Sequence, residues 1–140
     1  MTQLLCVDPQ RVDEVWPHVI LGISQALKRG AGGQLFEIEQ DLYRGHALLW
    51  LAIDGERKKE IRASLITQLV KTDAGLKCKI LALSGQRRGD WLNHFPAIEQ
   101  FARDEGCTSI EFSGRKGWAR ILPDYEQIAI VMRKEIHGKL

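Results

Sequence analysis

The sequence lacks long apolar runs and has no strong excess of either charge. None of its apolar stretches is long enough to cross a membrane. The first residues lack the basic start and the apolar core of a secretion signal. With 20 lysines and arginines against 18 aspartates and glutamates, the formal net charge is only +2. This small excess argues neither for nor against nucleic acid, which we do not expect as a partner. We predict a soluble, cytoplasmic protein without a membrane partner.

Cysteine and histidine are scarce and scattered. Cys6, Cys78 and Cys107 are widely spaced and odd in number, and no two of them have the spacing of a zinc finger. This usage is typical of reduced thiols in a cytosolic protein. No two of the four histidines stand four residues apart, the spacing that would place two metal ligands on one helix face. We predict no metal site, and the Gly-x-Ser-x-Gly elbow of a serine hydrolase is also missing.

Apolar residues are plentiful, at 44%, and their spacing predicts alternating strands and helices in one domain over residues 1–140. Three apolar segments with short connections favour an antiparallel meander, and a later strand–helix–strand unit favours a parallel pair. The expected fold class is α+β, a mixed sheet flanked by helices. Pro17 is expected to kink the first helix or to start a second segment. In order, we expect a strand at 4–7, helices at 9–23 and 35–42, strands at 47–53, 61–70 and 77–83, a helix at 91–105, a strand at 109–113, a helix at 117–122 and a strand at 125–134.

The most informative stretch is the turn between the strand that ends at Leu83 and the helix expected from Trp91. The turn contains a glycine, Gly89, and two arginines, Arg87 and Arg88. A helix start presents unpaired backbone N–H groups and the positive end of the helix dipole, both of which favour an anion. The arginines add positive charge and directed donors. This turn therefore predicts a phosphate-binding site.

The element order and this turn together resemble the GNAT family of N-acetyltransferases. In that family the fourth strand leads into a pyrophosphate loop of pattern Gln/Arg-x-x-Gly-x-Gly/Ala, where acetyl-CoA lies. Gln86 and Gly89 supply the first and fourth positions of that pattern. The resemblance implies acetyl-CoA as cofactor, held by Leu81, Leu83, Gln86, Arg87, Arg88, Gly89 and Asp90.

The chain departs from the family pattern at two positions. Trp91 stands at the sixth position of the loop, where the family has glycine or alanine, and an indole there would crowd the pyrophosphate. Leu122 stands where the family often has a tyrosine that acts as general acid, and leucine has no proton to donate. Tyr125 lies nearby but matches a different position of the pattern. Both departures favour a protein that no longer transfers acyl groups.

Residues 114–125 also look like the small GNAT-like proteins of tailed bacteriophages and prophages. That likeness implies a non-catalytic protein, in the host cytoplasm or on the virion, that acts through protein contacts in virion assembly or host interaction. Its partner would be a phage structural protein or a host protein, and a homodimer is a further form of association. The alternative is an acetyl-CoA-dependent N-acetyltransferase that acts on an amine the sequence does not identify.

An N-acetyltransferase needs a base for the acceptor amine, because an ammonium ion is not a nucleophile. Candidates are His46, Glu111 and Glu37, and Glu111 is the one that could face the cleft from the strand after the crossover. The competing interpretation is an exposed carboxylate on an alternating strand. Trp91 and Trp118 would either fill the cofactor space or form a patch for a protein partner. Basic residues on the same side would be Arg87, Arg88, Arg115, Lys116 and Arg120.

Overall fold

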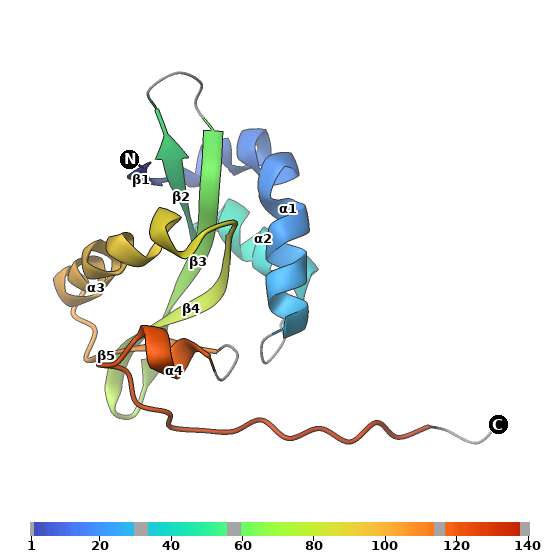
Figure 1. The fold of residues 1–140 in the computed structure, drawn as a ribbon, viewed down its shortest axis with the longest axis vertical. Coiled ribbons are helices and arrows are strands. Elements are labelled where there is room, and N and C mark those ends of the chain that lie inside the picture. Colours follow the sequence, from blue (N-terminus) through green and yellow to red (C-terminus); the bar gives the residue numbers. More distant parts are fainter. Residues whose placement is uncertain (1, 30–33, 56–59, 114–116, 138–140) are drawn as a thin grey trace.

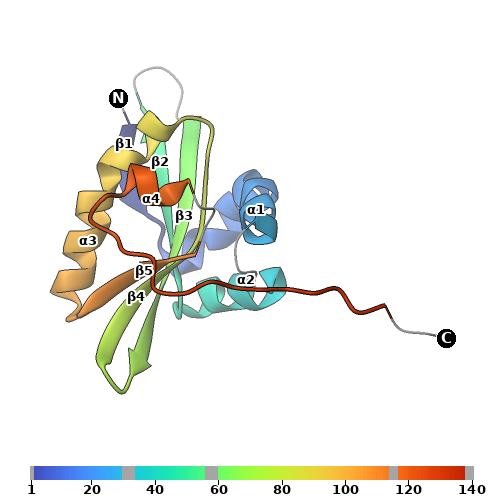
Figure 2. The ribbon, with the colours of Figure 1, turned by 60° about the horizontal axis from the view of Figure 1, so that its bottom comes forward.

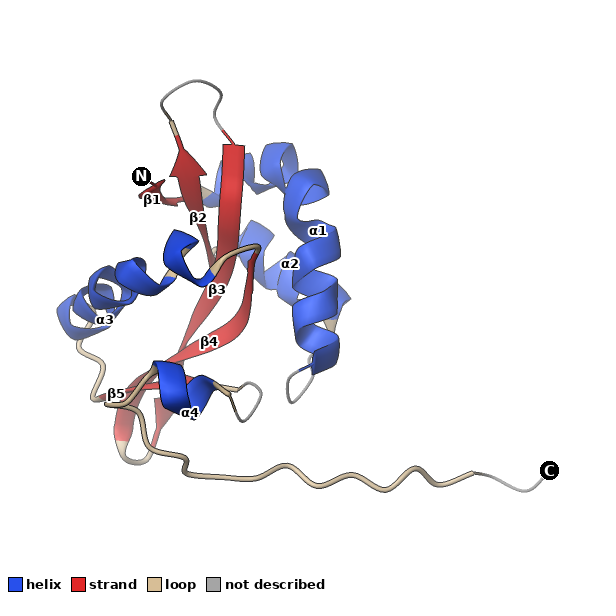
Figure 3. Cartoon of the chain, in the orientation of Figure 1, coloured by secondary structure: helices blue, strands red, loops and turns tan. Residues whose placement is uncertain are grey.

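A mixed five-stranded sheet carries helices on both of its faces (Figures 1 and 3). The computed structural model describes residues 2–29, 34–55, 60–113 and 117–137. The first four strands are antiparallel neighbours in chain order, and the fourth and fifth are parallel. This arrangement confirms the predicted α+β class, with its meander and its parallel pair. The strands are β1 (Thr2–Cys6), β2 (Leu48–Asp54), β3 (Glu60–Thr72), β4 (Gly75–Gly85) and β5 (Ser109–Phe112).

Helices α1 (Val12–Arg29) and α2 (Leu35–Arg44) cover one face of the sheet. A short 3₁₀ turn, Pro9–Arg11, precedes α1, and the Asp8 carboxylate caps it by accepting the Gln10 amide at 2.9 Å. The helix passes through Pro17 without interruption, where we expected a kink or a new segment. Proline removes one hydrogen bond, and the burial of Trp16 and Val19 beside it holds the helix together.

Helices α3 (Phe95–Asp104) and α4 (Trp118–Ile121) lie on the opposite face (Figure 2). The sheet therefore separates two apolar clusters. The cluster under α1 and α2 includes Ile23, Leu42 and Leu49, none of which is exposed. The cluster under α3 and α4 is richer in aromatic rings and includes Trp91 and Phe95.

The prediction of a last strand at residues 125–134 is wrong for this structure. Residues 126–137 form no helix or strand, and they run away from the body of the protein as an exposed chain (Figures 1 and 2). The alternating pattern favours an extended backbone, but a strand also needs a neighbour with which to pair its N–H and C=O groups. None of the five strands pairs with this segment.

Of the described residues, none lies in a helix long and apolar enough to span a membrane.

Candidate functional site

The parallel strands β4 and β5 pair along only part of their length. Residues 77–80 of β4 pair with 109–112 of β5, and β4 then continues to Gly85 without β5 beside it. A β-bulge marks the same point, because Ile66 and Thr67 of β3 face Ala82 and Ile80, so Leu81 is the extra residue. A bulge bends a strand and redirects the side chains that follow it. The sheet therefore opens at Leu81.

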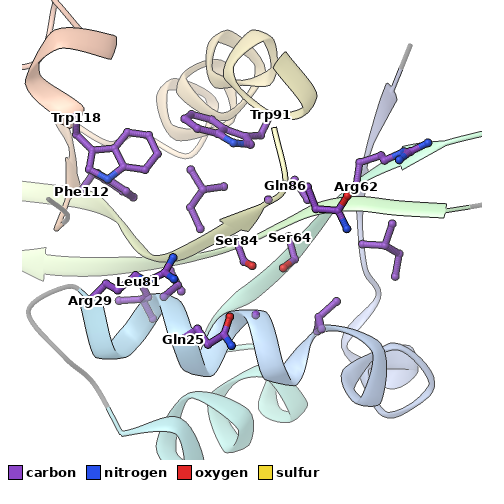
Figure 4. Close-up of a pocket in the computed structure, with 18 of the residues that line it drawn as sticks. Gln25, Arg29, Arg62, Ser64, Leu81, Ser84, Gln86, Trp91, Phe112 and Trp118 are labelled. Atoms are coloured by element: carbon purple, nitrogen blue, oxygen red, sulfur yellow. The ribbon is translucent and has the colours of Figure 1, made fainter. Parts of the chain in front are cut away.

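A cavity of about 590 Å³ lies beside this opening. It is bounded by α1 on one side, by the start of β3 and the ends of β4 and β5 at its floor, and by α4 and Trp91 on the other side (Figure 4). Helix α1 approaches β4 closely at Gly22, where a Cβ atom would collide with the hydroxyl of Ser84. The absence of a side chain at Gly22 thus sets the spacing between this helix and the sheet.

Two indoles form one wall of the cavity. The Trp91 ring packs over Gly85, where an added Cβ would lie 2.7 Å from the Trp91 Cδ1 atom. The Trp91 and Trp118 ring centroids are 4.8 Å apart, and Trp118 lies edge-to-face on Phe112 at 4.6 Å. Trp91 is only 9% exposed. The indole expected to crowd the phosphate turn is instead folded into the protein, and it lines the cavity without filling it.

The opposite wall is polar and positively charged. His18, Gln25 and Arg29 come from α1 at helical spacing, and Figure 4 shows Gln25 and Arg29 facing the strand ends. Arg62 from β3 also lines the cavity, but its guanidinium is paired with Asp54 at 3.4 Å and with Glu60 at 3.1 Å. No aspartate or glutamate is among the described residues that line the cavity. The site therefore favours neutral or anionic ligand groups over cationic ones.

The turn after β4 differs from the prediction. Helix α3 begins at Phe95, not at Trp91, and two 3₁₀ turns, Arg88–Asp90 and Leu92–His94, come between. The amides of Asp90 and Trp91 bond to the carbonyls of Arg87 and Arg88, at 3.0 and 3.3 Å. A tight 3₁₀ turn consumes the N–H groups that an α-helix start would leave unpaired.

Two amides in this turn nevertheless stay available. Those of Arg88 and Gly89 form no hydrogen bond within the described part of the chain. A Cβ atom at Gly89 would meet nothing within 4 Å, so packing within the chain does not require a glycine there. Arg87, Arg88 and Gly89 are all exposed. The turn can therefore offer backbone donors and two guanidinium groups to an anion from solvent.

The predicted cofactor residues divide into two groups. Leu81, Leu83 and Gln86 line the cavity. The other four stand outside it, on the turn that follows Gln86: Arg87, Arg88 and Gly89, which are exposed, and Asp90, which is half-buried. The two groups are consecutive along the chain, and they form one path from the open edge of β4 to the turn.

The candidate bases lie elsewhere. The Glu111 carboxylate is paired with the Lys77 ammonium at 3.3 Å, on the closed part of the β4–β5 pair, and it does not line the cavity. Glu37 and His46 are exposed on and after α2, and neither lines the cavity. The histidine that does line it is His18, which we had considered only as a metal ligand. Its place on one face of α1 with Gln25 and Arg29 is the signal that could have identified it.

Neither of the residues near the expected tyrosine position can serve as an acid in the cavity. Leu122 is buried in the aromatic cluster. The Tyr125 hydroxyl donates to the Glu99 carboxylate of α3 at 2.7 Å, and Tyr125 does not line the cavity. Burial and this hydrogen bond raise the pKa of Tyr125 above its ordinary value. Arg115 and Lys116, part of the expected basic side, lie outside the described residues, whereas Arg120 is exposed on α4.

Solved structures provide the comparison for this fold and site. An aminoglycoside acetyltransferase from an uncultured soil metagenomic sample superposes with a TM-score of 0.70 at 12% identity, covering 97% of each chain. A predicted acetyltransferase with acetyl-CoA from Clostridium acetobutylicum gives 0.65 at 14% identity, covering 98% of this chain and 96% of its own. A GNAT family acetyltransferase from Staphylococcus aureus gives 0.63 at 11%, covering 96% and 98%.

The chain has a GNAT-like fold. At these identities the likeness concerns the fold and not the chemistry. No protein-family model and no curated protein matches the sequence, and no comparison links the chain to phage proteins. In the described residues no cluster of histidine, cysteine, aspartate and glutamate could hold a metal ion.

Proposed function

We propose that this chain is an acyl-CoA-dependent N-acyltransferase. The observation that carries the proposal is the opening of the GNAT-like sheet at Leu81, which joins a cavity to an exposed turn with two arginines. The free edge of β4 over residues 81–85 offers backbone groups to a pantetheine chain. The amides of Arg88 and Gly89 offer donors to its phosphates. Bound acyl-CoA would supply the activated thioester that an amine attacks.

The cavity wall on α1 would hold the acceptor amine. His18 is the titratable side chain placed there by α1, and imidazole is the side chain most often used to accept a proton in catalysis. Arg29 forms no ion pair among the described residues, so its charge is available to a carboxylate or phosphate on the acceptor. A polycation such as an aminoglycoside would need carboxylates on this wall. The acceptor we expect is an amine whose remaining groups are neutral or anionic.

Departure of the thiolate would proceed without a tyrosine acid. Leu122 carries no proton, and Tyr125 is held by Glu99 on α3. Solvent would then protonate the thiolate at the open cavity. We expect slow turnover for this reason, because a positioned general acid contributes about 10²–10⁴-fold.

The missing acid also favours a second candidate, a GNAT-like protein that acts through protein contacts alone. Its role in virion assembly or host interaction stays a prediction from the sequence. Such a protein would not release the free thiol of CoA from acyl-CoA, whether or not it binds that ligand.

Thermal unfolding with acetyl-CoA tests the binding. At a concentration of about 100 times the dissociation constant, a ligand of the folded state adds about 2.7 kcal/mol and raises Tm by several degrees. Arg87→Ala together with Arg88→Ala should weaken the shift. Arg44→Ala together with Lys71→Ala, on α2 and β3, removes the same two charges from exposed residues outside the cavity and is the control. No shift with millimolar acetyl-CoA would overturn the proposal.

Thiol release with a panel of amines tests the chemistry. Turnover that is lost in His18→Gln, with acetyl-CoA binding unchanged, would support the role of His18. Binding without turnover on any amine would favour the protein-contact candidate instead.

A further inference from the structure

Two polar side chains are buried among the described residues, and they differ in their hydrogen bonding. Thr67 is 1% exposed, and its hydroxyl accepts a hydrogen bond from the Trp50 indole at 2.9 Å. Ser64 is 5% exposed, and within the described part of the chain its hydroxyl forms no hydrogen bond. A buried hydroxyl without a partner costs free energy, so a serine at this position calls for an explanation.

The position of Ser64 in the sheet makes a serine there unexpected. Ser64 lies on β3, opposite Leu51 of β2 and Ser84 of β4. Leu51, and Ile66 two residues further along β3, belong to the apolar cluster under α1 and α2. Alternation along a strand places Ser64 and Ile66 on the same face. A polar residue in a row of core residues is typical of a functional site.

Ser84 supplies a second hydroxyl at the same place. Directly opposed residues of antiparallel strands have Cβ atoms about 4.5–5.5 Å apart, so one ligand group can reach both hydroxyls. Both serines line the cavity, and Figure 4 shows their oxygens pointing toward α1. Gly22 of α1 leaves room for the Ser84 hydroxyl, because a Cβ atom at Gly22 would collide with it. The floor of the cavity therefore offers two hydroxyls to a ligand.

Helix α1 adds further donors beyond Gly22. Gln25 and Arg29 follow on successive turns of the same helix face, and both line the cavity. The Gln25 amide donates hydrogen bonds, and the Arg29 guanidinium donates them and carries a positive charge. Arg29 forms no ion pair among the described residues.

A carboxylate is the ligand group that uses all of these donors. Its two oxygens accept several hydrogen bonds, and its single negative charge balances that of Arg29. An ammonium group would meet no aspartate or glutamate among the described lining residues. A neutral amide would leave the charge of Arg29 unbalanced, and a phosphate would bring a charge of about −2 to one arginine.

We propose that the Ser64 and Ser84 hydroxyls bind the carboxylate of the acceptor, and that the acceptor is an amino acid. Gln25 and Arg29 complete the carboxylate site from α1. His18 lies on the same face of α1, before these two residues, and is left for the amine. This assignment rests on the proposed N-acyltransferase function, because it names the acceptor of that reaction.

The reaction would give an N-acyl amino acid and the free thiol of CoA. His18 removes one proton from the ammonium group, and the nitrogen then bonds to the thioester carbon as the carbon–sulfur bond breaks. The nitrogen releases a second proton to solvent, and solvent protonates the thiolate.

Thermal unfolding tests the class of acceptor. Each of the twenty amino acids is added at about 10 mM, with and without acetyl-CoA, and at least one should raise Tm. The carboxamide of that amino acid should raise Tm much less, because it lacks the negative charge. No rise with any amino acid in either condition would overturn the proposal. An equal rise with the carboxamide, or a larger rise with O-phosphoethanolamine, would also overturn it.

Alanine variants of the two serines test the site. Ser64→Ala and Ser84→Ala should each weaken the affinity for that amino acid about tenfold or more. Their stability in urea should be unchanged or higher, since each variant removes a hydroxyl that lacks a partner within the chain. Ser109→Ala, at an exposed position of β5 outside the cavity, is the control and should bind as the wild type does. Unchanged affinity in Ser64→Ala, or weaker binding that accompanies a loss of stability, would overturn the proposal.

The outcomes distinguish this inference from the proposed function. An amino acid that binds through the two serines while acetyl-CoA does not bind would refute the acyltransferase and support the carboxylate site. Thiol release only with amines that lack a carboxylate would support the acyltransferase and overturn the amino-acid acceptor.

Discussion

The two halves of strand β4 differ in what lies beside them. Residues 77–80 have β3 on one side and β5 on the other, whereas residues 81–85 have only β3 beside them in the described part of the chain. Cys78 and Ile80 in the closed half are 0% and 2% exposed, and Leu83 and Ser84 in the open half are partly exposed. One strand thus serves as core at its start and as an open edge beside the cavity at its end.

The difference shows how this fold makes a site without a dedicated loop. The bulge at Leu81 redirects the strand at the residue where pairing with β5 stops. Backbone groups beyond it lose their neighbour and face the cavity. Backbone N–H and C=O groups without a hydrogen-bond partner cost free energy at this position. Such a cost is expected where a ligand supplies the missing partners.

The largest difference between the halves should appear in core truncations. Ile80→Ala removes a side chain that is 2% exposed, and we expect it to lower the free energy of unfolding by about 2–5 kcal/mol. Leu83→Ala in the open half should cost roughly 1–2 kcal/mol, because Leu83 is partly exposed already. Urea denaturation measures both. Equal losses would mean that the open half is packed as tightly as the closed half.

A second test concerns the two glycines at the open end. Gly85→Ala would place a Cβ atom 2.7 Å from the Trp91 ring and 3.1 Å from the Ala63 Cβ. We expect a loss of about 1–3 kcal/mol in unfolding free energy, since the indole must move. Gly89→Ala meets no atom within 4 Å and should change stability by less than about 0.5 kcal/mol.

Variants at the same two glycines distinguish effects on packing from effects on ligand binding. In a Trp91→Ala background the additional cost of Gly85→Ala should largely disappear, because the two residues are coupled by contact. Gly89→Ala should weaken acetyl-CoA binding in spite of its normal stability, if the turn approaches the phosphates through its backbone. A full cost of Gly85→Ala in the Trp91→Ala background would contradict the proposed packing.

The closed half should tolerate the loss of its ion pair. Glu111→Gln removes the ion pair with Lys77, in which the nitrogen–oxygen distance is 3.3 Å. The side chains of Lys77 and Glu111 are 24% and 30% exposed. We expect a loss of about 0.2–1 kcal/mol that shrinks at high salt. Glu37→Gln on the exposed face of α2 is the control. Any thiol release by the wild type should persist in Glu111→Gln, and its loss with normal stability would place Glu111 in the chemistry.

The smallest effect should be a dependence on pH from His94, at the start of α3. Burial lowers the pKa of His94, and its Nε2 lies 2.7 Å from the Thr2 hydroxyl. The neutral imidazole is therefore favoured in the folded state. Its stabilisation is present above the ordinary histidine pKa of about 6.5 and is lost as the pH falls through the lower folded-state value.

Denaturation of matched variants isolates this contribution. Between about pH 7 and pH 5, the wild type should lose more stability than His94→Gln, while His46→Gln, at an exposed site, should follow the wild type. Parallel curves for the wild type and His94→Gln would show that protonation of His94 is not linked to unfolding.

Local patterns in the sequence were sufficient for most of the sheet. The apolar segments around Leu49, Leu65 and Ile80 and the short turns between them predicted the meander, because antiparallel neighbours need only tight connections. Helix α2 and the stop of α3 before Gly106 also followed from periodicity and from glycine. The turn from Gln86 to Asp90 was predicted as a phosphate site from its residues, whereas Leu81 and Leu83 were predicted as cofactor residues from the family resemblance.

Other parts depended on distant neighbours. Helix α3 begins at Phe95 and not at the predicted Trp91, because the Trp91 ring packs against Gly85 and Trp118. No sequence pattern within β4 itself predicts the bulge at Leu81. The place of His18 in the cavity wall arises because α1 crosses the strand ends.

The sequence by itself determined which segments form strands and which form helices, since periodicity and turn chemistry act over a few residues. It also determined that residues 125–134 have the pattern of a strand. Only the tertiary structure decided that β4 opens at Leu81, that two indoles form a wall of the cavity there, and that the last segment pairs with none of the five described strands. Pairing and packing join residues far apart in sequence, so no local pattern can specify them.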